Sequence, residues 1–385
     1  MSELSYLEKL LDGVEVEWLP LGEVSALRRG RVMSKGYLTE NFGPYPVYSS
    51  QTANNGKIGS INTFDFDGEY ISWTTDGANA GTVFYRTGKF SITNVCGLIT
   101  LKSKCPLIYK FLFYWLTIEA KKHVYSGMGN PKLMSHQVEN IPVPIPCPDN
   151  PEKSLAIQSE IVRILDKFSA LTAALTAELT MRKKQYNYYR DQLLSFDEGE
   201  VEWKMLGDLG ENLDSKRKPI TSGLREAGSI PYYGASGIVD YVKDYIFDGD
   251  FLLISEDGAN LLARNTPIAF SISGKSWVNN HAHVIKFDSY AERRYVEYYL
   301  NSIDLAPYIS GAAQPKLNKK NLESIRIPNP SPEDKERIVS ILDKFDALTN
   351  SINEGLPREI ELRQKQYEYY RDLLFSFPRP ETASN

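Results

Sequence analysis

The chain has 385 residues, a formal net charge of −5, a hydrophobic fraction of 42% and a charged fraction of 24%. This length predicts two or more globular domains, and the acidic balance excludes a protein that binds DNA through its overall charge alone. The three cysteines form no CxxC pair, which argues against a disulfide scaffold or a structural zinc site and favours a cytoplasmic protein. No apolar run approaches the roughly 20 residues that cross a bilayer, so we expect no membrane partner.

Blocks of sequence recur in the same order in both halves of the chain. A period this long that occurs twice indicates duplicated domains rather than a solenoid. The helix-like blocks are nearly identical, whereas the stretches between them share only short landmarks, so one part of the repeat is constant and the other varies. The clearest pairs are EVEW (15–18 and 200–203), FDG (66–68 and 247–249), DGAN (76–79 and 257–260), ILDKF (164–168 and 341–345) and KQY (184–186 and 365–367).

The predicted fold class is α+β: two mixed α/β domains separated by two long antiparallel coiled-coil helices. Strand-like runs such as EYISWTT and DFLLIS alternate with turns rich in Gly, Asn and Asp. The N-terminal YLEKLL resembles the helix end YRDQLL, so we expect the two chain ends to meet in a pseudo-twofold circular arrangement. The expected segments are a first domain with an N-terminal helix stub (1–155), a central helix (156–196), a second domain (197–333), a C-terminal helix (334–377) and a tail (378–385).

Apolar residues at steps of three and four predict a coiled-coil seam along both long helices. A stripe this narrow on a long helix needs a partner, and a twofold relation between the copies makes the pair antiparallel. We expect the two ILDKF blocks to face each other across this seam. The expected seam residues are Ile164, Phe168, Leu171, Leu175 and Leu179 in the first helix and Ile341, Phe345, Leu348, Ile352 and Leu356 in the second.

The two long helices differ in length between their matched blocks. Fourteen residues separate Thr172 from Tyr186, against eighteen between their counterparts in the second half. Four additional residues are about one helical turn, which keeps the seam nearly in phase. Gly355 and Pro357 nevertheless predict a kink or interruption nearby. The tandem units TAAL and TAEL in the first helix suggest a spacer whose length sets the separation of the two domains.

Motifs of catalysis and metal binding are missing from the sequence. The stretch AFSISGKS (269–276) begins with alanine where a phosphate loop requires glycine, and no GxGxxG or Asn/Asp-Pro-Pro-aromatic motif is present. We interpret HAH (281–283) as strand residues of a core or a loop contact rather than as metal ligands. We therefore expect no catalytic residue, no metal and no cofactor in this chain.

Basic and amide side chains cluster at like places in both halves and predict DNA contacts. Such side chains bind phosphates or base edges, although each cluster alone could be an ordinary solvated loop. Their recurrence in both halves favours DNA. The expected DNA-binding residues are Arg28, Arg29, Arg31, Lys35, Gln51, Asn54, Asn55, Lys57, Asn130, Lys132, Lys216, Arg217, Lys218, Gln314, Lys316 and Lys319.

The EVEW starts, the duplicated ILDKF and KQYxYYRD helices and the QPKL exit resemble the DNA specificity subunit of type I restriction-modification systems, closest to type IC. The resemblance covers essentially the whole chain. It implies a non-catalytic protein in which each variable domain is a target recognition domain for one half of a bipartite, asymmetric double-stranded DNA site.

The same resemblance implies that the coiled coil sets the gap and docks two methyltransferase subunits, which restriction subunits then join. S-adenosylmethionine, ATP and magnesium would bind those partners. Two alternatives stay open at this point: a self-contained DNA-modifying enzyme, against which the missing motifs count, and a coiled-coil scaffold that binds only protein.

Overall fold

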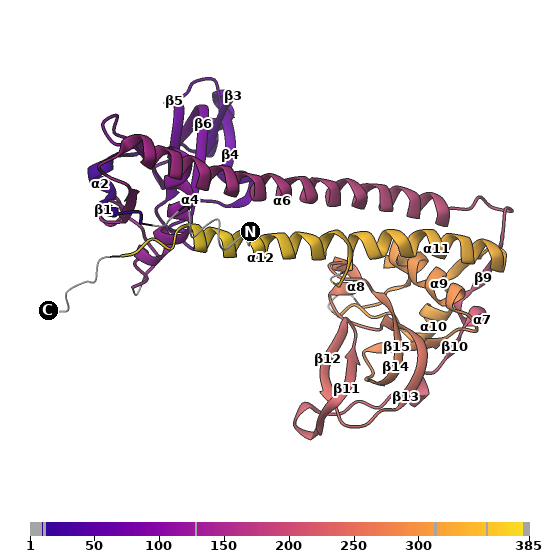
Figure 1. Cartoon of the computed structure of the whole chain (residues 1–385). Coiled ribbons are helices and arrows are strands. Elements are labelled where there is room, and N and C mark those ends of the chain that lie inside the picture. Colours follow the sequence, from indigo (N-terminus) through magenta and orange to yellow (C-terminus); the bar gives the residue numbers. More distant parts are fainter. Residues whose placement is uncertain (1–9, 11–12, 128, 312–313, 352, 380–385) are drawn as a thin grey trace. The chain divides into compact units, whose positions relative to one another are not determined.

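The computed structural model describes residues 10, 13–127, 129–311, 314–351 and 353–379 (Figure 1). The chain divides into two compact units: unit 1 comprises Met1–Ala174 and Ile360–Asn385, and unit 2 comprises Leu175–Glu359. Most of the predicted N-terminal helix stub and the end of the predicted tail lie outside the described residues. Within the described residues, no helix is long and apolar enough to cross a membrane.

Unit 1 contains a six-stranded sheet in the order β2-β7-β5-β6-β3-β4, in which all neighbours are antiparallel except the parallel pair β3–β6. A separate antiparallel pair joins β1 to β8. The strands are β1 (Val16–Pro20), β2 (Ser25–Arg29), β3 (Phe42–Tyr48), β4 (Lys57–Ile61), β5 (Phe66–Thr74), β6 (Val83–Ile92), β7 (Cys96–Leu101) and β8 (Pro142–Pro146). The shorter α-helices in the described part of unit 1 are α2 (Leu21–Val24), α3 (Lys35–Glu40), α4 (Tyr109–Glu119) and α5 (Ser135–Val138).

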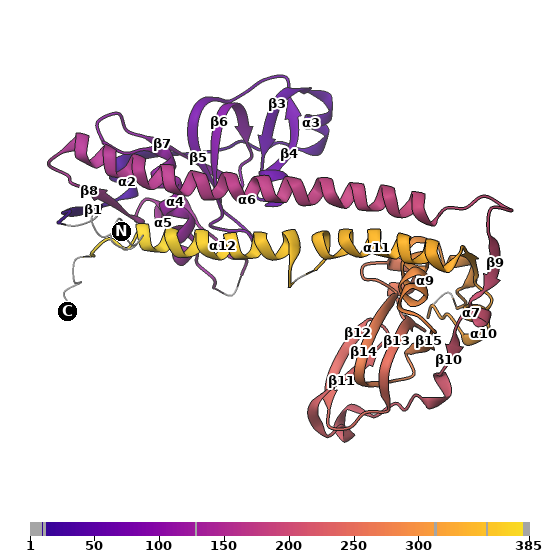
Figure 2. The same ribbon diagram turned by 45° about the vertical axis from the view of Figure 1, so that its right-hand side comes forward.

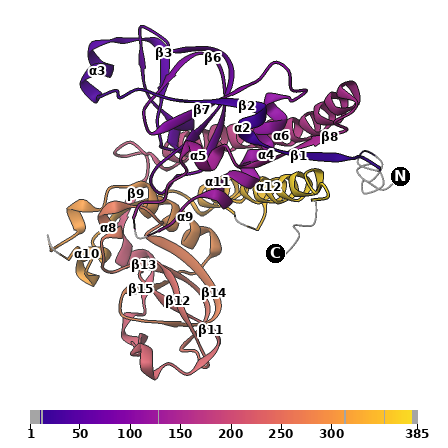
Figure 3. The same ribbon diagram turned by 90° about the vertical axis from the view of Figure 1, so that its left-hand side faces the viewer.

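Unit 2 repeats this topology with the order β10-β15-β13-β14-β11-β12 and the separate pair β16–β9 (Figures 2 and 3). The tandem duplication and the α+β fold class are therefore confirmed. The strands are β9 (Glu202–Met205), β10 (Glu211–Asn212), β11 (Ala227–Gly234), β12 (Gly237–Val242), β13 (Phe247–Ser255), β14 (Ala269–Val278), β15 (Ala282–Lys286) and β16 (Arg326–Asn329). The shorter helices are α7 (Leu206–Leu209), α8 (Asn260–Ala263), α9 (Tyr290–Ser302) and α10 (Lys319–Glu323).

A pair of facing glycines at equivalent places explains why FDG recurs. Gly68 pairs with Gly88 across β5–β6, and Gly249 pairs with Gly274 across β13–β14. All four have positive φ, from 76° to 139°, which side chains rarely tolerate. Both units therefore require glycine at this pair of strand positions.

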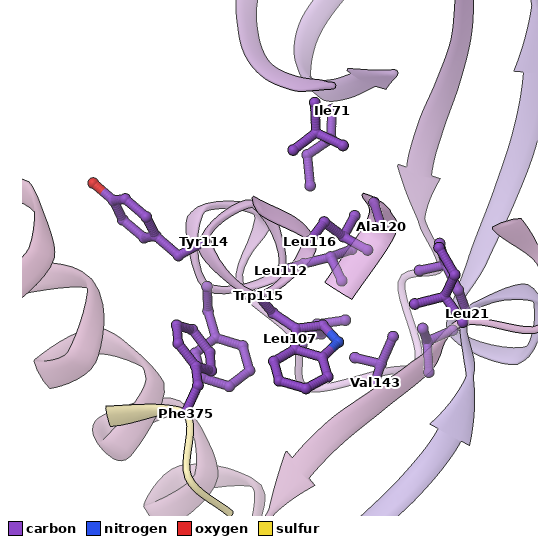
Figure 4. Close-up of a cluster of buried hydrophobic side chains, with 14 of the residues drawn as sticks. Leu21, Ile71, Leu107, Leu112, Tyr114, Trp115, Leu116, Ala120, Val143 and Phe375 are labelled. Carbon is purple, nitrogen blue, oxygen red and sulfur yellow. The ribbon is translucent and has the colours of Figure 1, made fainter. Parts of the chain in front are cut away.

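The core of unit 1 lies between its sheet and α4 (Figure 4). Leu112, Trp115 and Leu116 of α4 are almost fully buried, together with Ile71 from β5. Phe375, which follows α12, closes this core from the other end of the chain, with its ring 5.7 Å from that of Trp115. Unit 1 therefore cannot be completed without the C-terminal segment.

Described segments near both ends of the chain contact each other within unit 1, as the circular arrangement predicts. Trp18 Nε1 in β1 donates to the backbone oxygen of Pro378 at 2.9 Å, and Arg379 lies 3.0 Å from the buried carboxylate of Glu119. In unit 2 the equivalent strand, which contains Trp203, follows the central helix α6 (Pro151–Leu194) through the continuous chain. A junction that is covalent in unit 2 is thus made by packing in unit 1.

The second long helix is interrupted. It consists of α11 (Pro332–Thr349) and α12 (Gly355–Leu374), and Gly355 has a φ of +74°. A Cβ on Gly355 would lie 2.3 Å from the backbone oxygen of Ala347, so no other residue fits there without a shift. The predicted interruption is confirmed, and the additional residues fall in the break between Thr349 and Gly355 rather than in a helical turn.

Within each unit, the ILDKF block near the start of one long helix packs against the KQYxYYRD block near the end of the other. The expectation that the two ILDKF blocks face each other is therefore wrong. In unit 1 Phe168 stacks on Tyr370, with ring centroids 5.3 Å apart and an interplanar angle of 25°. In unit 2 the equivalent pair, Phe345 and Tyr189, stacks at 5.7 Å and 28°. The paired segments are antiparallel, and the same Phe–Tyr contact recurs in both units.

Two deeply buried residues near the start of the two long helices directly follow the predicted seam residues Ile164 and Ile341 in the sequence. Leu165 and Leu342 are fully buried, because each also forms a wall of its unit's core, whereas Leu171 is 41% exposed. Ile352 lies outside the described residues. The other predicted seam residues are half-buried: Ile164, Phe168, Leu175, Leu179, Ile341, Phe345, Leu348 and Leu356.

Candidate nucleic-acid interface

Five loops of unit 1 are joined by hydrogen bonds into one surface, which we call loop cluster 1. These loops are 29–31, 49–57, 75–79, 93–95 and 130–133. Most of the residues that the sequence predicted for DNA contact in this half belong to this cluster. The fold therefore gathers side chains that are up to a hundred residues apart in the sequence.

The loop after β6 is the centre of loop cluster 1. The backbone N–H of Asn94 donates to the oxygen of Arg31 at 3.1 Å, and the Arg29 guanidinium donates to the oxygen of Asn94 at 2.9 Å. Thr93 Oγ1 donates to Ser49 Oγ at 2.9 Å, which attaches the second loop. These bonds hold the basic loop 29–31 and the amide-rich loop 49–57 against the same turn.

A buried arginine supports the amide-rich loop from below. Arg86 donates to the backbone oxygen of Asn55 at 2.8 Å, and its guanidinium carbon lies 3.6 Å from the centre of the Tyr48 ring. Burial lowers the pKa of Arg86 to about 10, so the group still carries its charge at neutral pH. Asn54 and Asn55 both adopt left-handed backbone conformations, which asparagine tolerates better than most residues. Loop 49–57 is thus fixed by the fold.

Three predicted side chains of unit 1 already have partners within the protein: Arg29, which bonds to Asn94, Arg31 and Gln51. Arg31 pairs with Asp65 at 3.0 Å, and the Gln51 amide donates to the backbone oxygen of Lys57 at 2.6 Å, so both side chains are already engaged. Lys35 is exposed at the start of α3, beyond the cluster's loops. The exposed members in or beside the loops are Arg28, Arg29, Arg31, Asn54, Asn55, Lys57, Asn130 and Lys132.

Unit 2 has an equivalent surface, loop cluster 2, formed by residues 214–218, 233–236, 256–260, 279–281 and 314–317. Asn279 N–H donates to the Tyr233 oxygen at 3.0 Å, and Glu256 N–H donates to the His281 oxygen at 2.9 Å. Ser255 Oγ donates to the backbone oxygen of Ala235. The predicted residues Lys216, Lys218, Gln314 and Lys316 are exposed in this cluster, whereas Lys319 lies on α10, 3.5 Å from Glu323.

Arg217 differs from the other predicted residues because its side chain is 13% exposed and is directed inward. It donates to Glu256 at 2.6 Å and to the backbone oxygen of Ala282 at 2.8 Å, and it lies 3.4 Å from Asp214. Burial opposes ionisation of Glu256, but hydrogen bonds from Arg217 and Lys316 and the nearby His283 hold its pKa below the usual range. Arg217 therefore stabilises the loops and does not face solvent as the sequence predicted.

His283 is the buried centre of this charged network. Its Nδ1 lies 2.6 Å from an Asp214 oxygen and its Nε2 lies 2.7 Å from the backbone oxygen of Leu317, and both partners accept. Asp214, Glu256 and His283 lie close enough together to hold a metal ion. However, Arg217 and Lys316 already supply positive charge to the two carboxylates. The cluster is best described as an ion-pair network that clamps the loops.

The two loop clusters share one backbone frame. In unit 1 Gly77 N–H donates to the Pro131 oxygen at 3.0 Å, and Leu133 N–H donates to the Thr75 oxygen at 2.9 Å. In unit 2 the equivalent bonds are Gly258 to Pro315 at 3.1 Å and Leu317 to Glu256 at 2.7 Å. The frame joins each DGAN loop to the NPKL or QPKL segment. The repeats of these motifs could have revealed the pairing, but DGAN alone had indicated only a turn.

A different side chain clamps the frame in each unit. In unit 1 Trp73 Nε1 donates to the Leu133 oxygen at 3.0 Å, and in unit 2 His283 Nε2 takes that role toward Leu317. Gly97 occupies the strand position equivalent to His283, and a Cβ there would lie 2.1 Å from the Trp73 ring. The tryptophan therefore requires the glycine, and neither residue had been singled out from the sequence.

Two duplicated domains, each with a loop surface that carries basic and amide groups, suit the class of proteins that recognise DNA. The family model for the type I restriction modification DNA specificity domain matches residues 13–181 and 198–362. The chain therefore belongs to this family. It is a non-catalytic DNA specificity subunit of a type I restriction-modification system.

Individual relatives agree over the whole chain. The specificity subunit of the type I restriction enzyme EcoR124I/EcoR124II from Escherichia coli is 42% identical and is covered in full, as is this chain. The EcoprrI specificity subunit, also from Escherichia coli, is 39% identical over 92% of this chain and 93% of the relative. The crystal structure of an S subunit from M. genitalium is 17% identical, covers 96% of this chain and 98% of that chain, and has a TM-score of 0.66, which supports the fold.

Proposed function

We propose that loop cluster 1 reads one half of a bipartite, asymmetric DNA site and that loop cluster 2 reads the other half. The observation that carries this proposal is the shared backbone frame with different side chains, since one scaffold with two sets of reading groups suits two different half-sites. The target recognition domains are then residues 1–155 and 197–333, and the helical segments 156–196 and 334–377 act as the spacer. The exposed basic residues supply phosphate contacts.

The helical segments dock two methyltransferase subunits at equivalent surfaces, and restriction subunits join that core. Repeated exposed aromatic residues support this part of the proposal. Tyr188 and Tyr369 occupy equivalent helix positions, are 62% and 57% exposed, and lie edge-on to the next tyrosine at 5.4 and 5.3 Å. Exposed tyrosines of this kind are frequent anchors of protein interfaces. S-adenosylmethionine, ATP and magnesium bind the partners, and the assembly acts on cytoplasmic DNA.

The test is co-expression of the chain with its methyltransferase subunit in a host without DNA methylation, followed by genome-wide detection of methylated adenines. The expected result is one bipartite motif with two different halves and a fixed gap. Absence of any bipartite motif in a complex shown to assemble would contradict the proposal. The purified chain with S-adenosylmethionine and DNA should transfer no methyl group, and such transfer would instead support the self-contained enzyme. Specific DNA binding that requires the methyltransferase would exclude the protein-only scaffold.

A further inference from the structure

Loop cluster 2 contains an open hollow of about 450 Å³, bordered by His281, Gln314 and Lys316 above the turn Asp257–Ala259. The turn and the segment 314–317 belong to the shared frame, so their backbone positions are fixed by the hydrogen bonds described above. The polar side chains at the rim of this hollow are therefore carried by loops with fixed backbone positions.

His281 is held in one orientation by its neighbour. Its Nδ1 lies 2.8 and 3.0 Å from the two carboxylate oxygens of Asp257, and a carboxylate accepts, so Nδ1 carries a hydrogen. The other ring nitrogen, Nε2, has no hydrogen-bond partner within the described part of the chain. The His281 side chain is 51% exposed. The histidine therefore offers a positioned nitrogen to a ligand.

Gln314 is the second polar group at the rim. It is exposed, and its amide forms no hydrogen bond to any residue that the structure describes. A glutamine amide offers an acceptor and a donor side by side, which matches the N6 and N7 edge of adenine in the major groove. Lys316 beside it is tied to Glu256 at 3.1 Å and keeps charge at the rim of the hollow.

Comparison with unit 1 separates the constant groups of the frame from the variable ones. Asp76, Gly77, Pro131 and Lys132 match Asp257, Gly258, Pro315 and Lys316, whereas Val95 stands at the place of His281 and Asn130 at the place of Gln314. The constant groups build the frame or carry charge, which cannot distinguish two half-sites. The two variable positions, 281 and 314, can distinguish two half-sites, because their side chains differ from those of unit 1 and face solvent.

We propose that His281 and Gln314 are specificity-determining residues that bind the major-groove edge of one or two base pairs in the half-site read by unit 2, with Asn130 as the counterpart in unit 1. This inference rests on the proposed function. Membership of the family does not identify these residues.

The test uses the full chain in complex with its methyltransferase subunit and compares methylated motifs. The double variant His281→Val plus Gln314→Asn places the residues of unit 1 on the frame of unit 2, where their backbone conformation is already compatible. We expect base discrimination at one or two positions of one half-site to fall about 10- to 100-fold, with the other half and the gap unchanged. Asn130→Gln is the matched control and should alter only the opposite half.

Each outcome decides between the inference and the function on which it rests. A wild-type complex without a bipartite motif contradicts the proposed function itself. A bipartite motif that the double variant leaves unchanged at every position overturns the inference alone. If the variant methylates DNA too weakly for its motif to be determined, its base discrimination is measured by competition binding with DNA duplexes instead. Loss of discrimination at one or two positions with unchanged binding to unrelated DNA supports the inference, and an equal loss for all sequences overturns it.

Discussion

Unit 1 and unit 2 clamp the same loop by different chemistry. Unit 1 uses the neutral indole of Trp73, which is 1% exposed, above Gly97. Unit 2 uses His283 within a network of carboxylates and cations. The backbone hydrogen bonds of the frame nevertheless agree within a few tenths of an ångström. Loop geometry is therefore the property common to both units, and the side chains that produce it have diverged.

A recognition domain of this type can therefore change its buried side chains while the backbone of its loop cluster keeps the same geometry. A tryptophan clamp depends on packing and a histidine clamp depends on charge, so the two units should respond differently to mutation and to pH. Comparing the two units in one chain also provides an internal control, because a change in one unit leaves the other as its reference.

The largest expected effect on the recognised DNA comes from the spacer. Deletion of Thr176–Leu179 removes four residues from the continuous helix α6, which shortens the helix by about 6 Å, or about one turn. We expect the gap of the methylated site to change by about one to two base pairs, while both half-sites keep their sequence. An unchanged gap in the methylation motif would contradict the spacer role, and altered half-sites would show that the two units do not read independently.

The clamp of unit 1 should be the more sensitive of the two to truncation. Trp73→Ala leaves a cavity in a fully packed core and removes the bond to Leu133, so we expect a loss of about 3–5 kcal/mol in the unfolding free energy of unit 1. Hydrogen exchange should show lost protection in residues 130–133 and unchanged protection in 314–317. Trp73→Phe, which keeps most of the packing, is the matched control and should cost about 1 kcal/mol.

The clamp of unit 2 should fail through charge instead. Asp214→Ala leaves His283 and Arg217 without their buried carboxylate partner, while the Arg217–Glu256 pair persists. We expect a loss of about 3 kcal/mol, visible as lost exchange protection in residues 314–317 with 130–133 unaffected. Equal loss in both segments would show that the clamps are coupled. Asp214→Asn, which keeps the shape, should retain part of the protection.

The sequence repeat predicted the duplicated fold well, because the constant helix blocks and the recurring FDG and DGAN landmarks mark equivalent backbone positions. It predicted the pairing of those blocks wrongly. ILDKF lies at the start of each long helix, and an antiparallel pair places starts against ends, so Phe168 meets Tyr370 rather than Phe345. An antiparallel arrangement of the two helices requires this pairing of starts with ends.

The candidate interface was predictable in outline only. Clusters of basic and amide residues correctly marked loops that the fold brings together in unit 1. Arg217 was assigned to the surface because the sequence does not show that Asp214, in the turn after β10, and Glu256, just after β13, both contact it. Trp73 was missed for the same reason, and the partners of His283 could not be named, although HAH was correctly interpreted as part of a core or a loop contact. A buried polar contact depends on tertiary neighbours, whereas a turn or a helix stripe depends on residues close in sequence.

Low pH should weaken the clamp of unit 2 before the clamp of unit 1, without any mutation. The folded state lowers the pKa of Asp214 and of Glu256: burial opposes this, but the neighbouring His283 and Arg217, and Lys316 for Glu256, outweigh it. A lowered pKa stabilises the folded state above the unfolded values of about 4, and this contribution is lost as pH falls through the folded values. Below about pH 4 residues 314–317 should lose exchange protection before residues 130–133, since Trp73 does not titrate. Simultaneous loss would contradict the assignment.

The smallest expected effect compares two equivalent lysines on the frame. Lys132 forms no ion pair within the described residues, whereas Lys316 lies 3.1 Å from Glu256 and is partly neutralised. Lys132→Ala in the complex with the methyltransferase should weaken binding to target and unrelated DNA alike, and should reduce the slope of log affinity against log salt by about 0.9, because one phosphate contact is lost. Lys316→Ala should change the slope less, since its ammonium already shares its charge with a carboxylate. A loss confined to one base position would instead show that the lysine reads sequence, in which case the frame itself, and not only the groups that vary on it, would carry specificity.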